Sequence, residues 1–466
     1  MAFGEKENRL LKNTVIYMVG NFGSKILTFL IVPLYTHYLS TSEFGTYETI
    51  VSILGLISPL CILAIHEGIL RWLLGSFEKR GEIISTGASI YLILICITEM
   101  IIMIFSIITH WKYSIFFGLL LLGSTLQTVL QFSARGLQSN KVFAFSGIIY
   151  TTVMLLLNLV CVIILRMNII GMFISSIIAS FVSVLYIGVS LKNTVSIQKK
   201  LINKTVAKDM LKYSILLVPN DISWWIMSIS DRIMLSYMIN PSATGIYSIA
   251  CKFPSIISIL HTIFYQAWQE QAVLEYKSED RDQFYTKVFN TYMKLALCVV
   301  LVLIPLSKWV IITFINASYQ SGYIYLGLLY LGAIFSSFSG FYGTGYISAK
   351  DTKNAMKTTF IGAVVNVVIN IILIPIIGIW AACLSTFIGY CIVWIIRVKQ
   401  TRKYFLIKVN WSVFMILFSL NVIFSLGICF NNLVFLYFMI IFSFGILFLT
   451  NKSTIVSIFK KIFMYC

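Results

Sequence analysis

Three cations stand in the middle of apolar stretches, and each shares a helix face with polar residues. Lys25, Arg232 and Lys252 all fall inside predicted membrane helices, where charged residues are rare and usually face a bundle interior. At helical spacing, the stripes are Lys25 with Tyr17, Asn21, Ser24 and Thr28; Arg232 with Asp221, Trp225 and Ser228; and Lys252 with Ser248, Ser255 and Thr262. The three cations are therefore predicted to line a polar cavity and to bind an anionic cargo.

Each of these residues also has a purely structural interpretation. Arg232 adjoins Asp231, and an ion pair that locks two helices would give the same pattern. Arg71 lies at one end of a predicted helix, where it is either a topology charge or part of an inner gate. Trp225 is either a stacking surface for cargo or a packing residue. The sequence leaves these alternatives open.

Acidic residues inside the apolar stretches suggest ion coupling. Glu67, Glu99 and Asp221 either relay protons or sodium ions, or simply neutralise a nearby lysine. The sequence has no glycine-rich phosphate loop, no CxxC pair and no cluster of metal-ligating residues. We therefore predict no catalytic residues, no metal site and no cofactor.

The elements that must position these residues are membrane helices. Hydrophobic residues make up 59% of the chain and charged residues only 11%, against roughly 25% charged in soluble domains. Since a helix needs about 20 apolar residues to cross a bilayer, the sequence predicts an all-α polytopic membrane protein with about fourteen spans. They are residues 13–37, 44–70, 83–109, 113–134, 142–165, 169–191, 213–239, 243–270, 288–315, 322–348, 356–374, 378–396, 411–430 and 432–450.

Basic residues predict the orientation. Lys and Arg crowd into every second connection and into both ends of the chain, whereas only Lys112, Arg166 and Lys308 fall near the other connections. Because basic loops stay in the cytoplasm, both termini are predicted to be cytoplasmic. The same rule explains the net charge of +18, so no nucleic-acid partner is needed.

An internal repeat organises the spans. "STSEFGTYE" (40–48) matches "NPSATGIYS" (240–248) at Gly45 and Gly245, and "IIGMFISSIIAS" (169–180) matches "IIGIWAACLSTF" (376–387). Six spans per half is an even number, so the halves are parallel repeats. We predict domains at residues 1–208, 209–408 and 409–466, of which the last holds two extra helices.

The repeat and the first helix carry a family resemblance. Two six-helix halves, each with Ser-x-x-Gly-x-Tyr after its first helix, resemble the multidrug/oligosaccharidyl-lipid/polysaccharide (MOP) exporter superfamily. The opening "KNTVIYMVGNFGSKILTFLIVPLYTHYLSTSEFGTYETI", with Pro33 and Phe44-Gly45, is similar to the polysaccharide transporters, the Wzx-type flippases of O-antigen and capsule repeat units. The resemblance implies a fold like that of MATE transporters, with two six-helix bundles. The extra pair departs from the twelve spans of many members and is similar to the arrangement in lipid II flippases.

The resemblance also implies a function. The cargo would be an oligosaccharide on undecaprenyl diphosphate, moved by alternating access across the bacterial inner membrane for surface polysaccharide synthesis. Lys25, Arg232, Lys252 and Arg71 would then bind the diphosphate, membrane lipids would surround the protein, and polymerase and chain-length proteins would be partners. One alternative is a MATE-type drug or cation antiporter, although such pumps favour acidic cavities. A polysaccharide polymerase or ligase is less compatible with the short outer connections, so no enzyme activity is expected.

Overall fold

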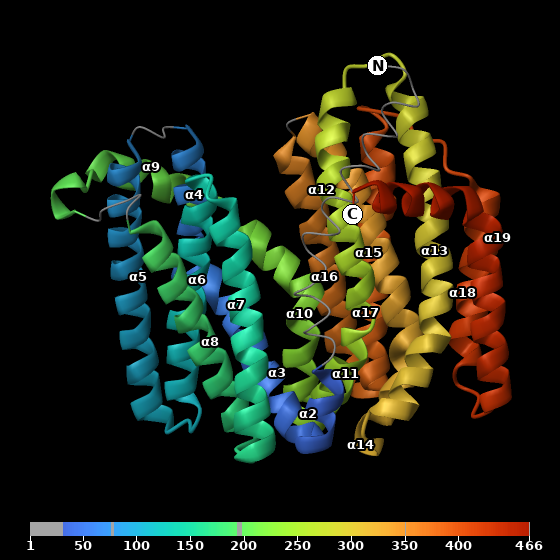
Figure 1. Ribbon diagram of the computed structural model, residues 1–466, viewed down its shortest axis with the longest axis horizontal. Helices are drawn as coiled ribbons and strands as arrows, with labels where there is room; N and C mark the ends of the chain where they lie inside the picture. The colour runs from blue at the N-terminus through green and yellow to red at the C-terminus, as the bar shows by residue number, and fades with distance from the viewer. Residues whose placement is uncertain (1–30, 76–78, 193–197, 350, 466) are drawn as a thin grey trace. The chain divides into compact units, whose positions relative to one another are not determined.

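The computed structural model describes residues 31–465, apart from 76–78, 193–197 and 350. Over these residues the chain is almost entirely helical and forms no strand, which confirms the predicted all-α fold (Figure 1). The chain divides into two compact units, one of residues 46–225 and one that joins the start of the chain, up to Gly45, to residues 226–466. We call them the N-terminal and the C-terminal unit.

The N-terminal unit contains most of α3, all of the next helices, and the first residues of α10. The bounds are α3 (Thr41–Cys61), α4 (Ile65–Gly75), α5 (Arg80–Thr109), α6 (Ser114–Gly136), α7 (Asn140–Asn158), the π-helix η2 (Leu159–Ile164), α8 (Asn168–Leu191), the 3₁₀ turn η3 (Lys199–Leu201) and α9 (Lys204–Ile215). Its core lies where α4, α6 and α9 meet, around Ile69, Leu73, Leu121 and Met210.

The C-terminal unit is larger and includes the two extra helices. The bounds are α2 (Val32–Tyr38), α10 (Val218–Met238), α11 (Pro241–Lys252), α12 (Ser255–Glu275), α13 (Arg281–Phe314), α14 (Ala317–Gln320), the 3₁₀ turn η4 (Ser321–Tyr325), α15 (Leu326–Ser348), α16 (Thr352–Ile377), α17 (Ile379–Thr401), α18 (Trp411–Gly427) and α19 (Leu433–Tyr465). Helix α17 packs against both α15 and α16, and α13 packs against α18 and α19.

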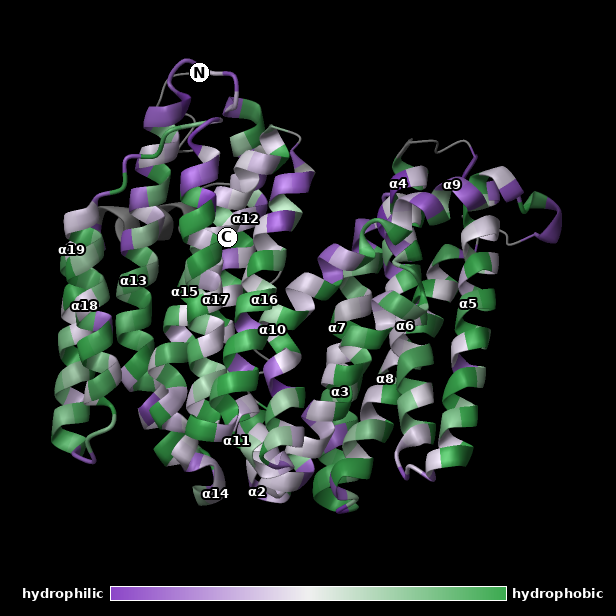
Figure 2. Ribbon diagram, turned by 180° about the vertical axis from the view of Figure 1, so that it is seen from behind, coloured by the Kyte–Doolittle hydropathy of each residue, from purple (hydrophilic) through white to green (hydrophobic). Residues whose placement is uncertain are grey.

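The helices fit a membrane. Within the described ranges, ten are long and apolar enough to cross one, or eleven if the bent pair α11 and α12 is a single span. Helix α18, of 17 residues, and α10 match two more of the predicted spans, and the remaining one, residues 13–37, lies mostly outside the described part. Figure 2 shows apolar residues along the middle of α5, α6 and α18, with hydrophilic residues concentrated towards helix ends.

Helix ends follow ordinary capping chemistry. Asn240 caps α11 by accepting a hydrogen bond from the Ala243 amide, and Pro241 occupies the first turn, where its missing N–H costs nothing. Asn203 caps α9 in the same way. Gly378, with φ +59°, makes the sharp turn between α16 and α17 that other residues would adopt only with strain.

The two copies of the repeated turn are in direct contact. A methyl group on Gly45 would lie 1.7 Å from the Pro241 carbonyl oxygen, and one on Gly245 would lie 2.1 Å from the Thr41 carbonyl oxygen. The first turns of α3 and α11 therefore cross backbone to backbone, through equivalent residues of the two repeats. Only glycine permits so close an approach, which explains why both copies carry it.

Lysines of α13 hold the extra pair of helices. The buried Lys308 ammonium donates to the carbonyl oxygens of Ile428 and Phe430 at the end of α18, at 2.7 and 2.8 Å. Near the other end of α13, Lys294 donates to the Thr450 carbonyl oxygen of α19 at 2.7 Å. Cations are favourable at helix C-termini, so both lysines fasten α18 and α19 to the C-terminal unit.

Candidate functional site

Part of the predicted site lies outside the described residues. Lys25, Asn21, Ser24 and Thr28 all precede residue 31. Their roles therefore stay predictions. The other predicted residues are distributed over α4, α5, α10, α11 and α12.

Arg232 lies on α10 and is anchored to α11. Its Nε donates to the Ser248 hydroxyl at 3.1 Å, and the Thr244 hydroxyl donates to the Arg232 carbonyl oxygen at 3.0 Å. The Arg232 side chain is only partly buried, whereas Ser248 is fully buried. The guanidinium is thus positioned by α11 and keeps part of its surface accessible.

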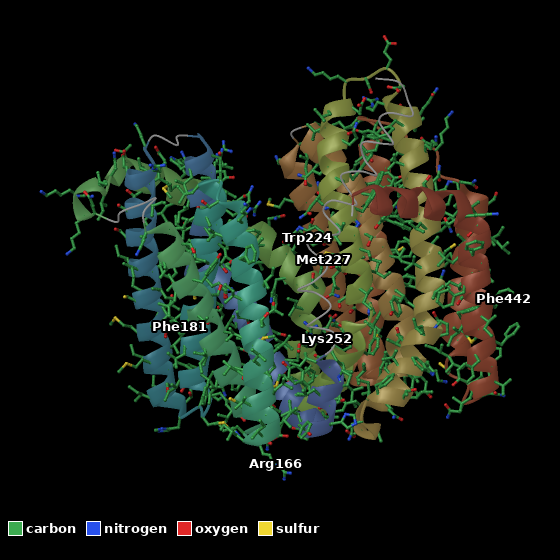
Figure 3. The ribbon with its side chains drawn as sticks, in the orientation of Figure 1. Arg166, Phe181, Trp224, Met227, Lys252 and Phe442 are labelled. Carbon is green, nitrogen blue, oxygen red and sulfur yellow. The ribbon has the colours of Figure 1, made fainter. Side chains whose placement is uncertain are left out.

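Lys252 lies at the C-terminal end of α11, just before the bend into α12 (Figure 3). Its side chain is partly exposed, and Ser255 at the start of α12 donates to the Lys252 carbonyl oxygen at 2.5 Å. Ser228, from the Arg232 stripe, is within hydrogen-bond distance of the Tyr390 hydroxyl, at 3.1 Å. The C-terminal unit therefore carries two partly exposed cations, Arg232 and Lys252, on the successive helices α10 and α11.

Arg71 belongs to an aromatic and charged cluster in the N-terminal unit. Its guanidinium lies 4.9 Å from the centre of the Tyr213 ring, and its side chain is exposed. Glu67, one turn away on α4, is close enough to Arg135 and Asp221 to interact with them electrostatically. Two predicted acidic residues and one predicted cation therefore share this end of the unit.

Trp225 packs within the protein. Its indole Nε1 donates to the Ser52 carbonyl oxygen at 3.1 Å, and a methyl group on Gly55 would lie 3.0 Å from the same nitrogen. The indole therefore lies against α3 in a place that a glycine leaves open. This geometry favours the packing interpretation over a stacking surface.

Glu99 lies against a glycine of the neighbouring helix. Its Oε2 atom is 2.7 Å from the position that a methyl group on Gly118 would take, and its buried Oε1 has no hydrogen-bond partner among the described residues. The structure gives Glu99 no lysine or arginine ion pair within the described part. Its predicted role in ion coupling stays a prediction.

Asp231 is the centre of a polar cage that the sequence did not reveal. The side chain is 1% exposed. Its Oδ2 accepts hydrogen bonds from the hydroxyls of Tyr247 and Thr386, at 2.7 and 2.6 Å. Its Oδ1 accepts from the side-chain amides of Asn370 and Asn366, at 2.6 and 3.4 Å. Four neutral donors from α11, α16 and α17 thus surround one carboxyl group, and we call this set the Asp231 cage.

The Asp231 cage is suited to a small cation. Hard cations prefer oxygen ligands, and the cage offers carboxyl, hydroxyl and amide oxygens. The buried Oδ1 of Asn370 has no hydrogen-bond partner among described residues, which leaves an acceptor unused beside the carboxyl group. In the described part of the chain, no group of three or more His, Cys, Asp or Glu side chains could hold a metal ion. One carboxyl group with neutral oxygens therefore fits a proton or a monovalent cation better than a transition metal.

A second buried charge lies in the same unit. Arg397 on α17 is 3% exposed, and its guanidinium donates to Thr358 and Thr359 of α16 at 3.1 and 3.0 Å and to the Ser339 carbonyl oxygen of α15 at 2.8 Å. All three acceptors are neutral. Arg397 thereby ties α17 to both of its neighbours.

Glycines on α15 leave room for side chains of neighbouring elements. Methyl groups on Gly340, Gly343 and Gly345 would lie 2.5, 2.9 and 2.4 Å from His261 Nε2, Arg397 Nη1 and Phe405 Cε1. The sequence "SSFSGFYGTGY" (336–346) is compatible with a flexing segment or with close packing. Because α15 is a continuous helix whose glycines receive neighbouring side chains, the structure favours close packing.

An open groove of about 400 Å³ lies along α18. It is lined by Met415, Ile416, Ser419, Leu420 and Ile423. The lining is almost wholly apolar, and Met415, Ile416 and Ile423 are exposed. The groove can receive an aliphatic chain.

Sequence reasoning missed the Asp231 cage and Arg397. Asp231 entered only as an ion-pair partner for Arg232, and Asn370 and Arg397 were assigned no role in the site. The signal was present as Asn366 and Asn370, two amides one helical turn apart in an apolar stretch. Such amides require polar partners in a membrane, and that requirement could have suggested a polar network on this helix.

Comparison with known proteins gives one family match. Residues 10–269 match the model of the family described as "Polysaccharide biosynthesis protein". The uncharacterized membrane protein MJ1068 of Methanocaldococcus jannaschii is 26% identical over 216 residues, which cover 44% of this chain. That alignment spans only 41% of the relative's own length.

Solved structures share the fold. The lipid II flippase MurJ in an inward closed conformation has a TM-score of 0.70 at 16% identity, over 95% of this chain and all of its own. An inward-facing multidrug resistance MATE family transporter of the MOP superfamily has a TM-score of 0.68 at 13% identity, over 84% and 97%. A MOP superfamily transporter from Pyrococcus furiosus has a TM-score of 0.61 at 14% identity, over 85% of this chain and 95% of its own. The predicted MATE-like architecture is confirmed.

Proposed function

Because this chain belongs to the polysaccharide biosynthesis protein family, we propose that it is a flippase that moves a lipid-linked oligosaccharide across the membrane. The predicted resemblance to the polysaccharide transporters is confirmed by that family match. The observation that carries the proposal is the combination of this family with a fold shared by transporters. The cargo is an oligosaccharide repeat unit on undecaprenyl diphosphate, destined for a surface polysaccharide.

The cargo's diphosphate explains the mid-span cations. A diphosphate that leaves water loses its hydration, and charge-assisted hydrogen bonds must replace it. Arg232 and Lys252 are partly exposed cations on α10 and α11, as such a site requires. We assign diphosphate binding to them together with Lys25, and we assign Arg71 to the cargo's entry from the cytoplasm. Asn21, Ser24, Thr28, Ser228 and Ser255 would supply further polar contacts.

The cargo's lipid tail needs an apolar path beside the polar one. The open groove along α18 offers such a surface, and α19 also exposes large apolar residues, among them Val434, Ile441 and Leu449. The tail would lie in this groove and remain in contact with membrane lipids while the sugar crosses the protein.

Transport against a gradient needs an energy source, and the Asp231 cage supplies a place for a coupling ion. A proton or a monovalent cation would neutralise the Asp231 carboxylate and release the Tyr247 and Thr386 hydroxyls from it. Since these donors come from α11 and α17, ion binding would change how those helices are held. Glu67, Glu99 and Asp221 are the alternative coupling groups.

The setting follows from the same proposal. The protein lies in the bacterial inner membrane with both termini in the cytoplasm, where the basic connections stay. The polymerase and chain-length proteins of the pathway would receive the flipped repeat unit. The chain itself would form and break no covalent bond, so we infer that it is not an enzyme.

Flipping in proteoliposomes tests the proposal. Purified protein would be reconstituted with a fluorescent oligosaccharide on a polyprenyl diphosphate, and outer-leaflet cargo would be measured by its accessibility to a glycosidase. Hydrogen bonds to charged groups contribute about 1.5–3 kcal/mol each, so Lys252→Ala should weaken cargo binding by about ten- to a hundredfold. Arg232→Lys, which keeps the charge but loses the planar fork, should fall between wild type and Arg232→Ala.

Lys204→Ala is the matched control, because Lys204 is an exposed lysine at the start of the amphipathic helix α9. Its flipping rate should equal that of the wild type. Wild-type rates from Lys252→Ala and Arg232→Ala would reject the cationic site. Uptake of small organic cations without any flipping would instead identify a MATE-type antiporter.

A further inference from the structure

The last helix changes direction at Asn451. This residue has φ −123° and ψ 18°, which are not helical values, and the stretch that follows runs crosswise to the upright part of α19 (Figure 1). Lys294 of α13 donates to the carbonyl oxygen of Thr450, the residue before the bend. Thr450 also approaches Cys298 of α13, with Oγ1 and Sγ 3.3 Å apart. The bend is therefore fixed to the C-terminal unit.

The sequence after the bend is amphipathic. Residues 452–465 read "KSTIVSIFKKIFMY", and Ile455, Ile458, Phe459, Ile462 and Phe463 follow the i, i+3, i+4, i+7, i+8 spacing of a helix with one apolar face. The segment carries three lysines, and the sequence has no Asp or Glu after Asp351. The segment is therefore basic and contains no acidic residue of its own.

We propose that residues 452–465 lie in the plane of the membrane surface and bind the headgroups of anionic phospholipids. The segment is too short to span a bilayer, which needs about 20 residues. A helix with an apolar stripe and a lysine-rich remainder is typical of interfacial helices, whose affinity combines apolar burial with attraction to anionic lipid. The segment also continues directly from α19, so its start is held where that helix leaves the apolar layer.

The membrane orientation predicted from the basic residues also favours anionic phospholipids as the partner. The segment lies beyond the last predicted span, on the side assigned to the cytoplasm, and the cytoplasmic leaflet carries anionic lipids. The main alternative partner for this segment is the inner end of the helix bundle itself. This inference goes beyond cargo transport, and it holds whichever cargo the protein carries.

Lipid quenching of single labels tests it on the full chain. In a variant without other cysteines, Phe459→Cys and Ser457→Cys place a bimane label at positions on opposite sides of the predicted helix. In vesicles of phosphatidylcholine and phosphatidylglycerol with brominated acyl chains, quenching at 459 should exceed quenching at 457 by about threefold, as expected for one buried face. The contrast should fall in pure phosphatidylcholine and with added salt.

Charge variants separate the two partners. Lys460→Gln/Lys461→Gln should reduce quenching at 459 in anionic vesicles, whereas Lys204→Gln/Lys208→Gln, which removes two exposed lysines of α9, should not. Equal quenching at 457 and 459, or quenching that is independent of anionic lipid, would overturn the proposal. A blue-shifted label at 459 that brominated lipid does not quench would identify docking on the bundle instead.

Hydrogen exchange on the unmodified protein tests the proposal without any substitution that could misfold the chain. In nanodiscs, the amides of residues 452–465 should exchange more slowly when phosphatidylglycerol is present than in phosphatidylcholine alone. Identical exchange in the two lipids would contradict the proposal without any substitution.

Discussion

Two buried side chains of opposite charge lie in the C-terminal unit, and their surroundings are alike. Asp231 is 1% exposed and accepts hydrogen bonds from four neutral donors, and Arg397 is 3% exposed and donates to three neutral acceptors. In both cases the partners include residues of α16. Within the described residues, the hydrogen-bond partners of both charges are neutral groups, so dipoles contribute to the stabilisation of each.

The difference between them is chemical. A carboxylate can take a proton or hold a cation, whereas a guanidinium keeps its charge in proteins. The Asp231 cage can therefore exist in two charge states, while Arg397 has one. Under the proposed function, Asp231 would be the switchable element of this unit, whereas Arg397 ties α15, α16 and α17 together.

Asp231→Asn should have the largest effect on transport. The substitution keeps the shape but removes the charge and replaces one acceptor oxygen by an amide donor that faces donors such as Asn370, so the cage can no longer hold a cation. We expect flipping to fall by about a hundredfold or more, since several charge-assisted bonds of about 1.5–3 kcal/mol are lost. The measurement is flipping in proteoliposomes across a range of sodium concentrations and pH. Unchanged ion dependence in a folded Asp231→Asn protein would remove the cage from the coupling step.

Arg397→Ala should have a large effect on stability instead. It removes a long buried side chain together with its three hydrogen bonds, and large-to-alanine changes in cores cost about 2–5 kcal/mol. Thermal unfolding in detergent measures the loss. Arg397→Met restores most of the volume and should recover part of the stability, with normal ion dependence of flipping. If the folded methionine variant loses that ion dependence, Arg397 takes part in the switch, and the contrast with Asp231 fails.

Gly343→Ala probes the Arg397 tie from the opposite side. The added methyl group would lie 2.9 Å from Arg397 Nη1, so the guanidinium must shift. Overpacking of this kind costs about 1–3 kcal/mol. In an Arg397→Met background the same substitution should cost less, because the guanidinium is gone, and a double-mutant cycle measures the difference. Additive effects would show that Gly343 and Arg397 do not act on each other.

Asp351→Asn should have the smallest effect, because this carboxylate lies at an exposed turn. Hydrogen bonds from Tyr404 and Asn354 hold the pKa of Asp351 below its ordinary value, and Lys403 lies 3.3 Å away. A lowered pKa adds stability that is present above the unfolded value of about 3.9 and is lost as pH falls through the folded value. The difference in melting temperature between wild type and Asp351→Asn should therefore stay constant between pH 5 and 8. The difference in melting temperature between wild type and Asp351→Asn should shrink below pH 4, where protonation removes the stabilising carboxylate from the wild type, and a difference that changes between pH 6 and 5 would contradict the prediction.

The sequence alone determined the membrane class, most helix positions and the kinship. These depend on local composition: a run of apolar residues predicts a span wherever it lies, and α5, α6 and α8 match their predicted ranges closely. The repeated Ser-x-x-Gly-x-Tyr also identified Gly45 and Gly245 as equivalent positions. The proposed domain limits and the cavity residues, Lys25 among them, stay predictions.

Tertiary structure decided which of the polar residues meet. Asp231, Thr386 and Asn370 are far apart in the chain, and no spacing rule connects α10 with α16 and α17. Lys308 lies near a connection that holds few basic residues, and the structure explains its presence because its ammonium group caps α18. The two glycines of the repeat came into contact only through the crossing of α3 and α11. Hydropathy depends on each residue and its neighbours in sequence, whereas a hydrogen bond between helices depends on their rotation and depth, which only the packing of the whole unit determines.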